Sequence, residues 1–174
     1  MEALSDDATS ERVDVALFRH VVSHFCSGVV VLTATTRSGP AGLTCQSFLS
    51  LSLDPPLVLF SVARSSHSWS LIRESGCVAV NILHAGQRAE SQAFAASGTD
   101  KFAGRAWRLG AHGAPLLTGA LAHVQCRLEA VHDGGDHEVG IARVLAVEAS
   151  SERRDPLLYY RSEYCGIGDR MTAD

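Results

Sequence analysis

The feature that most constrains the fold is a pair of long strand-like segments joined by a glycine-rich turn. Segments 120–132 and 137–149 are rich in alternating apolar and β-branched residues, and Asp133-Gly134-Gly135-Asp136 separates them. Aspartate–glycine and glycine–glycine pairs are typical of hairpin turns, because glycine readily adopts the positive φ that these turns need. The sequence therefore predicts a hairpin of two long antiparallel strands.

The remaining apolar segments predict a mainly β protein with a few helices. Helical spacing and end signals, such as Asp14 as a first cap and Gly76 as a stop, indicate helices at 14–25, 66–75 and 85–97. Strands are expected at 28–36, 41–48, 49–53, 57–63 and 77–83, with a last short strand within 156–167. Because turns join most consecutive strands, we expect an antiparallel barrel with peripheral helices and not a doubly wound sheet.

Segment 98–115 is a glycine-rich stretch of 18 residues without an obvious helix or strand pattern. Loops of this length in a compact domain are usually functional or mobile. The sequence thus indicates a long loop that could contribute to a site.

Composition indicates one globular domain. The chain has 174 residues, of which 46% are apolar and 20% are charged. The net charge of −4 gives no basic surface for nucleic acid, and no apolar run approaches the roughly 18 residues of a membrane helix. The polar N-terminus lacks the pattern of a signal peptide. We expect a disordered leader at 1–12, a domain at 13–168 and a frayed tail at 169–174.

The five cysteines lie far apart and form no Cys-x-x-Cys pair. This spacing favours buried free thiols in a reducing, cytoplasmic environment over disulfides or a zinc site. His20 and His24 lie one helical turn apart, but no third metal ligand is evident, so no metal site is expected. Nucleotide-binding and hydrolase motifs such as GxGxxG, GxxxxGK[ST], HExxH and GxSxG are absent.

Hydroxyl residues interrupt the apolar stretch GLTCQSFLSLSLDPPLVLFSVARSSHSW at 42–69. On one regular strand, alternation would place Thr44, Gln46, Ser50 and Ser52 on a common face and Ser47 on the other. Such a face could be the solvated side of an edge strand, or a row of neutral donors for a ligand. Both interpretations remain open on this pattern alone.

Two further positions allow a binding interpretation beside a structural one. Arg64 precedes Ser65, Ser66 and Ser68 at a predicted helix start, which is either an anion site or a helix cap with additional serines. His137 follows the hairpin turn and begins a strand. A histidine there either contacts a ligand or is a solvated turn residue.

Taken together, these segments resemble the flavin reductase-like domain family, the small reductases that feed reduced flavin to two-component monooxygenases. The resemblance covers roughly residues 14–166. It rests on FRHVVSHFCSGVVVLTA, GLTCQSFLSLSLDPPLVLFSVARSSHSW, CVAVNIL, DKFAGRAW, GAPLLTGALAHVQCRLEAVHDGGDHEVGIARV and PLLYYRSEY in that order. It implies a split barrel of the FMN-binding type, with Greek-key antiparallel strands, that works as a homodimer.

The resemblance also implies the residues of the site. The family pattern Thr-x-Asn-Ser-Phe reads Thr44-Cys45-Gln46-Ser47-Phe48 here, so an amide one methylene longer replaces the usual asparagine. His137 matches the histidine that meets the nicotinamide and is the expected catalytic residue. The expected flavin-binding residues are Thr44, Cys45, Gln46, Ser47, Ser50, Ser52, Ala63, Arg64, Ser68, Asn81, Phe102, Arg161 and Tyr164.

The implied reaction is hydride transfer from NADH to FAD or FMN, with the reduced flavin passed to a separate monooxygenase component. NADPH would require an arginine near its 2′-phosphate, for which Arg105 and Arg108 are candidates, and NADH is the favoured donor. Two alternatives keep the barrel. One is an oxidoreductase with tightly held flavin that acts on another substrate, and the other is a non-enzymatic module that binds flavin or haem.

Overall fold

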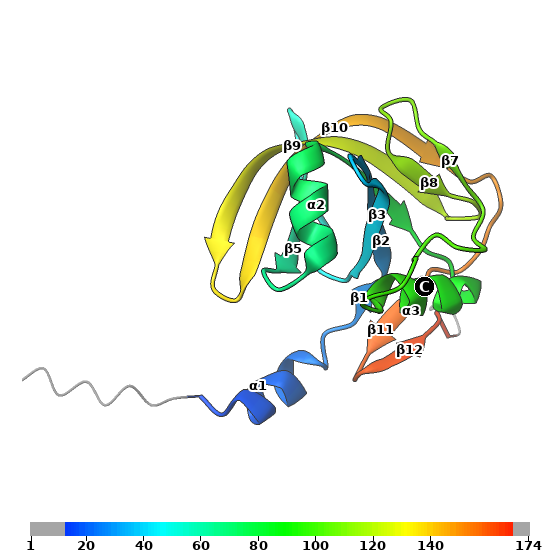
Figure 1. Ribbon diagram of the computed structural model, residues 1–174. Coiled ribbons are helices and arrows are strands. Elements are labelled where there is room, and N and C mark those ends of the chain that lie inside the picture. Colours follow the sequence, from blue (N-terminus) through cyan, green and yellow to red (C-terminus); the bar gives the residue numbers. More distant parts are fainter. Residues whose placement is uncertain (1–12, 169–174) are drawn as a thin grey trace, which may run out of the picture.

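A curved seven-stranded antiparallel sheet forms the body of the protein in a computed structural model that describes residues 13–168 (Figure 1). The strand order is β3-β2-β6-β9-β10-β5-β4, and every neighbouring pair is antiparallel. The strands are β2 (Val30–Thr36), β3 (Gly39–Cys45), β4 (Leu49–Leu53), β5 (Pro56–Ala63), β6 (Cys77–Ile82), β9 (Ala122–Gly134) and β10 (His137–Ala149). This architecture confirms the expected mainly β split barrel. The predicted leader 1–12 and tail 169–174 lie outside the described residues.

The β9–β10 hairpin is present as the sequence predicted. Its turn residue Gly135 has φ +80°, a left-handed conformation that favours glycine, and His137 lies opposite Gly134 in the register. At 13 residues each, β9 and β10 are the longest strands, and two register irregularities let the hairpin follow the curve of the sheet. On its other side, β10 pairs with β5, which places His137 opposite Ala63.

The main core lies between the concave side of this sheet and helix α2 (His67–Ser75). Trp69 is buried on α2 and packs edge-to-face on Phe60 of β5, with ring centroids 5.7 Å apart. Ser66 caps the start of α2, and Gly76, with φ +73°, ends it. Both helix boundaries agree with the sequence prediction.

Helix α1 (Val15–Val22) begins at Asp14, whose carboxylate accepts hydrogen bonds from the backbone N–H groups of Ala16 and Leu17. It confirms the predicted cap, but it lies away from the barrel and buries none of its residues (Figure 1). Its apolar side chains Val15, Leu17, Phe18, Val21 and Val22 are all exposed. A helix of eight residues is short for independent stability, and nothing within residues 13–168 covers this apolar surface.

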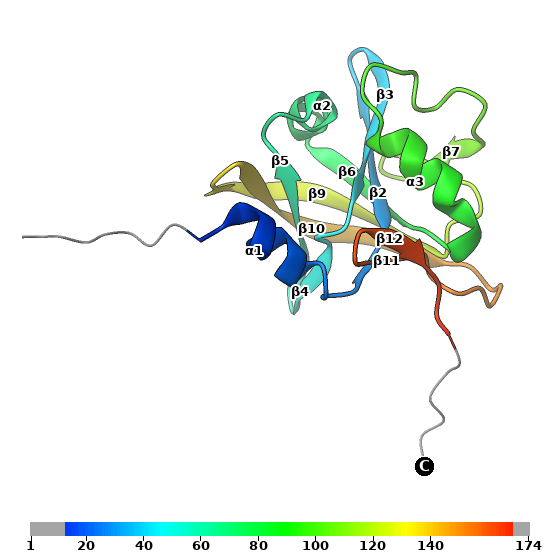
Figure 2. The ribbon, with the colours of Figure 1, turned by 90° about the horizontal axis from the view of Figure 1, so that it is seen from below.

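The smaller elements cover one end of the barrel. Figure 2 shows helix α3 (Arg88–Ala95) beside the hairpin of β11 (Leu158–Tyr160) and β12 (Glu163–Cys165). A 3-10 turn, η1 (Ala85–Gln87), leads into α3, and β1 (Ser27–Gly28) pairs with β11. The C-terminal segment thus forms two strands where the sequence predicted one.

The glycine-rich segment 98–115 also holds more structure than the sequence predicted. Strand β7 (Trp107–Leu109) lies within it and pairs with β8 (Pro115–Leu117). Trp107 packs on Phe102, with ring centroids 5.6 Å apart, which anchors this excursion to the core.

All five cysteines lie in the described residues and are free thiols, as predicted, but only Cys45 and Cys126 are buried, whereas Cys77 and Cys165 are half-buried and Cys26 is exposed. None of the helices between residues 13 and 168 has the length and apolar character needed to cross a lipid bilayer.

Candidate functional site

A pocket of about 1120 Å³ opens between five parts of the chain that are distant in sequence. The end of β3 and the following turn form one wall, and the end of β5 with the first turn of α2 forms a second. The end of α3 and the loop after it supply a third wall. Tyr159, Tyr164 and His137 complete the lining. The volume is large enough for a ligand of cofactor size.

The hydroxyl and amide segment supplies the first wall. Thr44, Cys45, Gln46 and Ser47 all line the pocket, as expected for a ligand-binding segment. The Thr44 hydroxyl donates to Ser91 O at 2.6 Å, and the Ser47 hydroxyl both donates to Ser61 O (2.7 Å) and accepts from Ser61 N (2.8 Å). These bonds join β3 to α3 and to β5, so the segment is held rigidly. Burial raises the pKa of the Cys45 thiol, which keeps this wall uncharged.

Ser50 and Ser52 do not line this pocket. The expectation of one continuous strand face over 44–52 is wrong, because β3 ends at Cys45 and β4 begins at Leu49. The two strands lie at opposite edges of the seven-stranded sheet, so their side-chain alternation is unrelated. The sequence indicated two strands here, at 41–48 and 49–53, but not that they lie at opposite edges of the sheet.

The second wall is the start of α2. Ala63 and Ser68 line the pocket as expected, together with Ser65, Ser66 and His67. The first backbone N–H groups of a helix lack partners within the helix and attract anions. Ser66 uses its hydroxyl to accept from Trp69 N at 3.3 Å, so part of the serine cluster serves as a cap. The cap interpretation therefore holds for Ser66, and Ser65 and Ser68 line the pocket.

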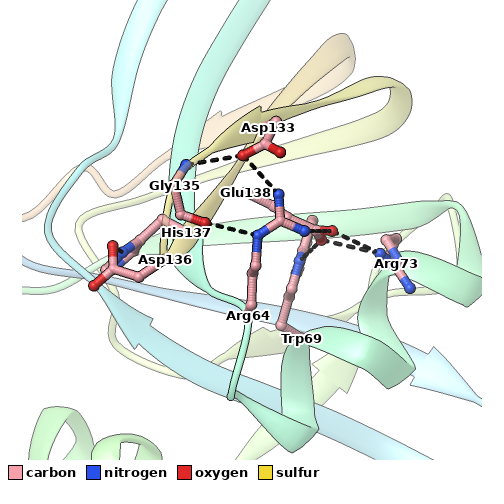
Figure 3. A network of polar contacts seen from close by, with 8 residues as sticks. All are labelled: Arg64, Trp69, Arg73, Asp133, Gly135, Asp136, His137 and Glu138. Carbon is pink, nitrogen blue, oxygen red and sulfur yellow. Dashed lines mark hydrogen bonds and ion pairs between the residues drawn. The ribbon is translucent and has the colours of Figure 1, made fainter.

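Arg64 is not part of the pocket lining, although the sequence placed it in the anion site. Its guanidinium contacts the β9–β10 turn and Glu138 instead, as Figure 3 shows. Sequence adjacency to the serines did not reveal this orientation, because consecutive residues at a strand end point to opposite sides.

Lys101 supplies the positive charge that Arg64 does not. It is the single lysine of the sequence, and it lines the pocket. The ammonium donates to Phe94 O (2.9 Å), Gly42 O (3.1 Å) and Ser68 Oγ (3.1 Å), and burial lowers the pKa of Lys101. No ion pair to a carboxylate is recorded for it within residues 13–168. Sequence reasoning missed Lys101, although a lone lysine within a long loop was an available signal.

Aromatic side chains contribute to the lining beside aliphatic residues and Asp100. Phe102 is 7% exposed and packs edge-to-face on Phe94, with ring centroids 5.0 Å apart. The Tyr164 hydroxyl lies 2.9 Å from Ser91 Oγ, and its ring packs on Tyr159 at 5.2 Å. The pocket therefore brings the expected residues Phe102 and Tyr164 together with the hydroxyl wall.

Two other expected residues lie elsewhere. Asn81 is fully buried, and its amide donates to Val31 O and Thr33 Oγ1 (both 3.0 Å) and accepts from Leu117 N (2.7 Å). These bonds commit its polar atoms to the core. Arg161 lies in the β11–β12 turn with φ +49°, and its backbone N–H donates to Ser23 O. Neither side chain lines the pocket.

His137 stands where β10 leaves the hairpin turn, and it lines the pocket while remaining partly exposed. Its Nδ1 lies 2.7 Å from Asp136 Oδ1, and this contact lowers the pKa of Asp136. When Nδ1 carries the proton, Nε2 is an acceptor, so the carboxylate can orient the ring. The histidine is available to a ligand at the rim of the pocket.

The described residues contain no group of three metal-ligating side chains. His20 and His24 pack ring against ring at 4.9 Å, and His24 Nδ1 contacts the backbone oxygen of His20 at 2.9 Å. The donor set of the pocket is neutral hydroxyls, an amide, an ammonium and a helix start. This set fits a phosphorylated polyol with an aromatic ring, such as a flavin, better than a metal ion.

Comparisons with known proteins agree with this chemistry. The model of the flavin reductase like domain matches residues 22–168. The reductase subunit of a flavin-dependent monooxygenase from Rhodococcus jostii is 46% identical over 172 residues, which cover 98% of this chain and 88% of that protein.

Two solved structures are similar over most of their length. One is a homologue of nitrilotriacetate monooxygenase component B from Mycobacterium thermoresistibile, with 45% identity and a TM-score of 0.87 over 91% of this chain and 90% of that one. The other is an NADH:FAD oxidoreductase from Streptomyces globisporus in complex with NAD and FAD fragments, with 32% identity and a TM-score of 0.86 over 94% of this chain and 100% of that one. On its sequence, its fold and the composition of its pocket, the chain belongs to the flavin reductase-like domain family.

Proposed function

We propose that the protein is an NADH-dependent flavin reductase that supplies reduced flavin to a separate monooxygenase. The observation that carries this proposal is one pocket that combines a cation, a helix start, a row of neutral donors and an exposed histidine. The Rhodococcus relative is named as the reductase subunit of a flavin-dependent monooxygenase, and the Streptomyces protein of similar fold is named as an NADH:FAD oxidoreductase, which supports the assignment.

The residues of the pocket suit the parts of a flavin mononucleotide unit. The charge of Lys101 and the N–H groups of the first turn of α2 would attract the phosphate, since Ser68 Oγ lies 3.1 Å from the Lys101 ammonium and places the two beside each other. Thr44, Gln46 and Ser47 would meet the ribityl hydroxyls and the polar edge of the ring. Phe102 and Tyr164 supply apolar surface beside them.

A bound flavin would supply the hydride-accepting chemistry, and the protein would bind and orient the two partners. No acid–base pair is needed for such a transfer, and none of the described pocket residues forms a catalytic triad. His137 would position the nicotinamide at the rim, which contributes by proximity. Asp136 would hold the imidazole in one orientation.

The two arginines considered for NADPH are engaged elsewhere. Arg108 forms an ion pair with Glu148. Arg105 donates from Nη1 to Ala103 O (3.0 Å) and Lys101 O (3.3 Å). These contacts favour NADH over NADPH as the donor. The choice between FAD and FMN rests on groups beyond the shared ribityl phosphate, and either flavin suits the pocket.

The exposed apolar residues of α1, together with Leu49, Leu51 and Leu53 on the edge strand β4, support a homodimer. An edge strand with unpaired backbone groups and apolar side chains favours association. A second copy of the chain would cover these surfaces. A cytoplasmic location, consistent with five free thiols, stays a prediction.

The decisive experiment follows NADH absorbance with purified protein in the presence of FMN, FAD or no flavin, and repeats it with NADPH. We expect oxidation of NADH that depends on added flavin, with a much slower rate for NADPH. A protein that stays yellow after purification and ignores added flavin would support the tightly held cofactor instead. Absence of any flavin-dependent rate would contradict the proposal.

A further inference from the structure

Glu138 is a nearly buried carboxylate beside His137, and four hydrogen bonds satisfy it (Figure 3). Trp69 Nε1 donates to Oε2 at 2.7 Å, and Arg73 Nη1 lies 2.9 Å from Oε1 and 3.0 Å from Oε2. Arg64 Nη1 donates to Oε1 at 3.1 Å. Because Trp69 and Arg73 belong to α2, this carboxylate ties the start of β10 to that helix.

Arg64 extends the same network to the hairpin turn. Its Nε donates to Gly135 O at 2.9 Å, and its Nη2 lies 2.8 Å from Asp133 Oδ1. Its backbone N–H donates to Asp136 O at 3.0 Å. All three guanidinium nitrogens are therefore committed to Glu138 and the turn. The turn itself contains two glycines, whose backbone freedom makes such restraint effective.

The network joins two walls of the pocket. On one side stands His137, fixed to the turn that Arg64 holds. On the other stands the first turn of α2, where Ser66 and Ser68 line the pocket one to three residues before Trp69. A shift of the hairpin relative to α2 would change the distance between the histidine and the phosphate-binding end.

We infer that Glu138 and Arg64 are positioning residues, which fix the hairpin against α2 and thereby hold His137 at the nicotinamide position. This inference rests on the proposed flavin reductase activity. Neither residue lines the pocket, so both act through His137 and not on substrate.

Arg73 and Arg64 contact their acceptors in different ways. Arg73 contacts the carboxylate through one nitrogen, which a lysine ammonium can replace. Arg64 uses its planar fork to reach three acceptors at once, which a lysine cannot do. The substitution R73K should therefore preserve the hairpin, whereas R64K should release it.

The test compares E138Q, R64K and R73K with E129Q. Glu129 pairs with Arg143 across the same two strands, but neither residue lines the pocket, so it provides a matched ion-pair control. Hydrogen–deuterium exchange of the backbone amides of residues 131–139 measures how often the hairpin opens locally. Steady-state kinetics give KM for NADH, and titration gives Kd for FMN.

We expect faster exchange in 131–139 and an increase of about tenfold in KM for NADH for E138Q and R64K. The FMN affinity of these variants should stay within about twofold, and R73K and E129Q should resemble wild type in every measurement. A role in general stability would instead raise exchange across the whole barrel and weaken FMN binding equally.

The inference is overturned if E138Q and R64K match E129Q in hairpin exchange, or if the hairpin loosens without a change in KM. If E138Q does not fold, the R64K variant alone tests the inference. This variant should fold, because it keeps the positive charge at a half-exposed position. A wild-type protein without flavin-dependent NADH oxidation would contradict the proposed function. The exchange comparison would still decide whether the network fixes the hairpin.

Discussion

The ammonium of Lys101 lies 3.1 Å from the hydroxyl oxygen of Ser68, so the loop after α3 contacts the first turn of α2 across the pocket. This contact places the single lysine of the chain beside a helix start. A cation beside a helix start favours an anion at this end of the pocket.

Replacement of Lys101 by methionine should weaken the binding of FMN but not of riboflavin. The three N–H groups of Lys101 already donate to Phe94 O, Gly42 O and Ser68 Oγ, so the ammonium would attract the phosphate as a nearby charge, worth on the order of 1.5 kcal/mol or roughly tenfold in FMN affinity. Riboflavin lacks the phosphate and serves as the ligand control. Fluorescence titration measures both constants. An equal loss for the two flavins would show that Lys101 maintains the pocket walls and does not bind phosphate.

Replacement of His137 by alanine should raise KM for NADH while leaving FMN affinity unchanged. The imidazole stands at the rim, where its loss removes a contact to the nicotinamide without opening the hydroxyl wall. An increase of roughly tenfold is expected for one lost hydrogen bond. Replacement of His132 on the neighbouring strand is the control, because this histidine does not line the pocket. Unchanged KM and kcat would show that His137 does not contact the nicotinamide.

The contribution of Glu138 to stability should disappear in acid. Its pKa lies below the ordinary value of 4.5, mainly because Trp69 donates to the carboxylate and then because Arg73 and Arg64 lie nearby. A lowered pKa means that the stabilisation is complete above the ordinary value and is lost as the pH falls through the lower folded-state pKa. The difference in unfolding free energy between wild type and E138Q should therefore be constant between about pH 7 and 5.5 and shrink below about 4.5.

Urea denaturation at each pH measures this difference. The neutral substitution V144A on the same strand is the control, since its effect on stability should not depend on pH. A difference for E138Q that persists unchanged into acid would show that ionisation of Glu138 is not what stabilises the fold.

Acidic substitutions on α1 should separate the proposed dimer. Phe18 and Val21 are more than half exposed, so replacing both by aspartate removes no packing within one copy. Sedimentation should then report 18.5 kDa instead of twice that mass. Val147 to aspartate, at an exposed valine near the end of β10, is the control. Dimers that persist in the α1 variant would assign the interface to another surface.

The sequence predicted those parts of the fold that depend on local chemistry. The Asp133–Asp136 turn and the boundaries of α2 at Ser66 and Gly76 follow from residues within a few positions of each other. The placement of Ser50 and Ser52 failed because the chain leaves β3 and crosses to the opposite edge of the sheet, which is a tertiary event. No local pattern encodes it.

The site divides in the same way. Thr44 to Ser47, Ser68, Phe102 and His137 line the pocket because their segments end at it. Arg64 turned away because the competing acceptor, Glu138, comes from a strand more than seventy positions later. The sequence nevertheless contained a signal for this ion pair. Glu138 lies on the same face of β10 as Gly140 and Ala142, which are both buried, and a charged residue on a buried face usually has a partner of opposite charge.

The pocket is lined by residues from Pro40 to Tyr164, so it spans most of the described chain. It exists only after the early hairpin of β2 and β3, the α2 segment, the loop with Lys101 and the C-terminal strands have all docked. Contacts between such distant segments form late, since long loops must close first. A partly folded chain lacks the complete pocket. Ligand binding would therefore report that all of these segments have reached their folded positions.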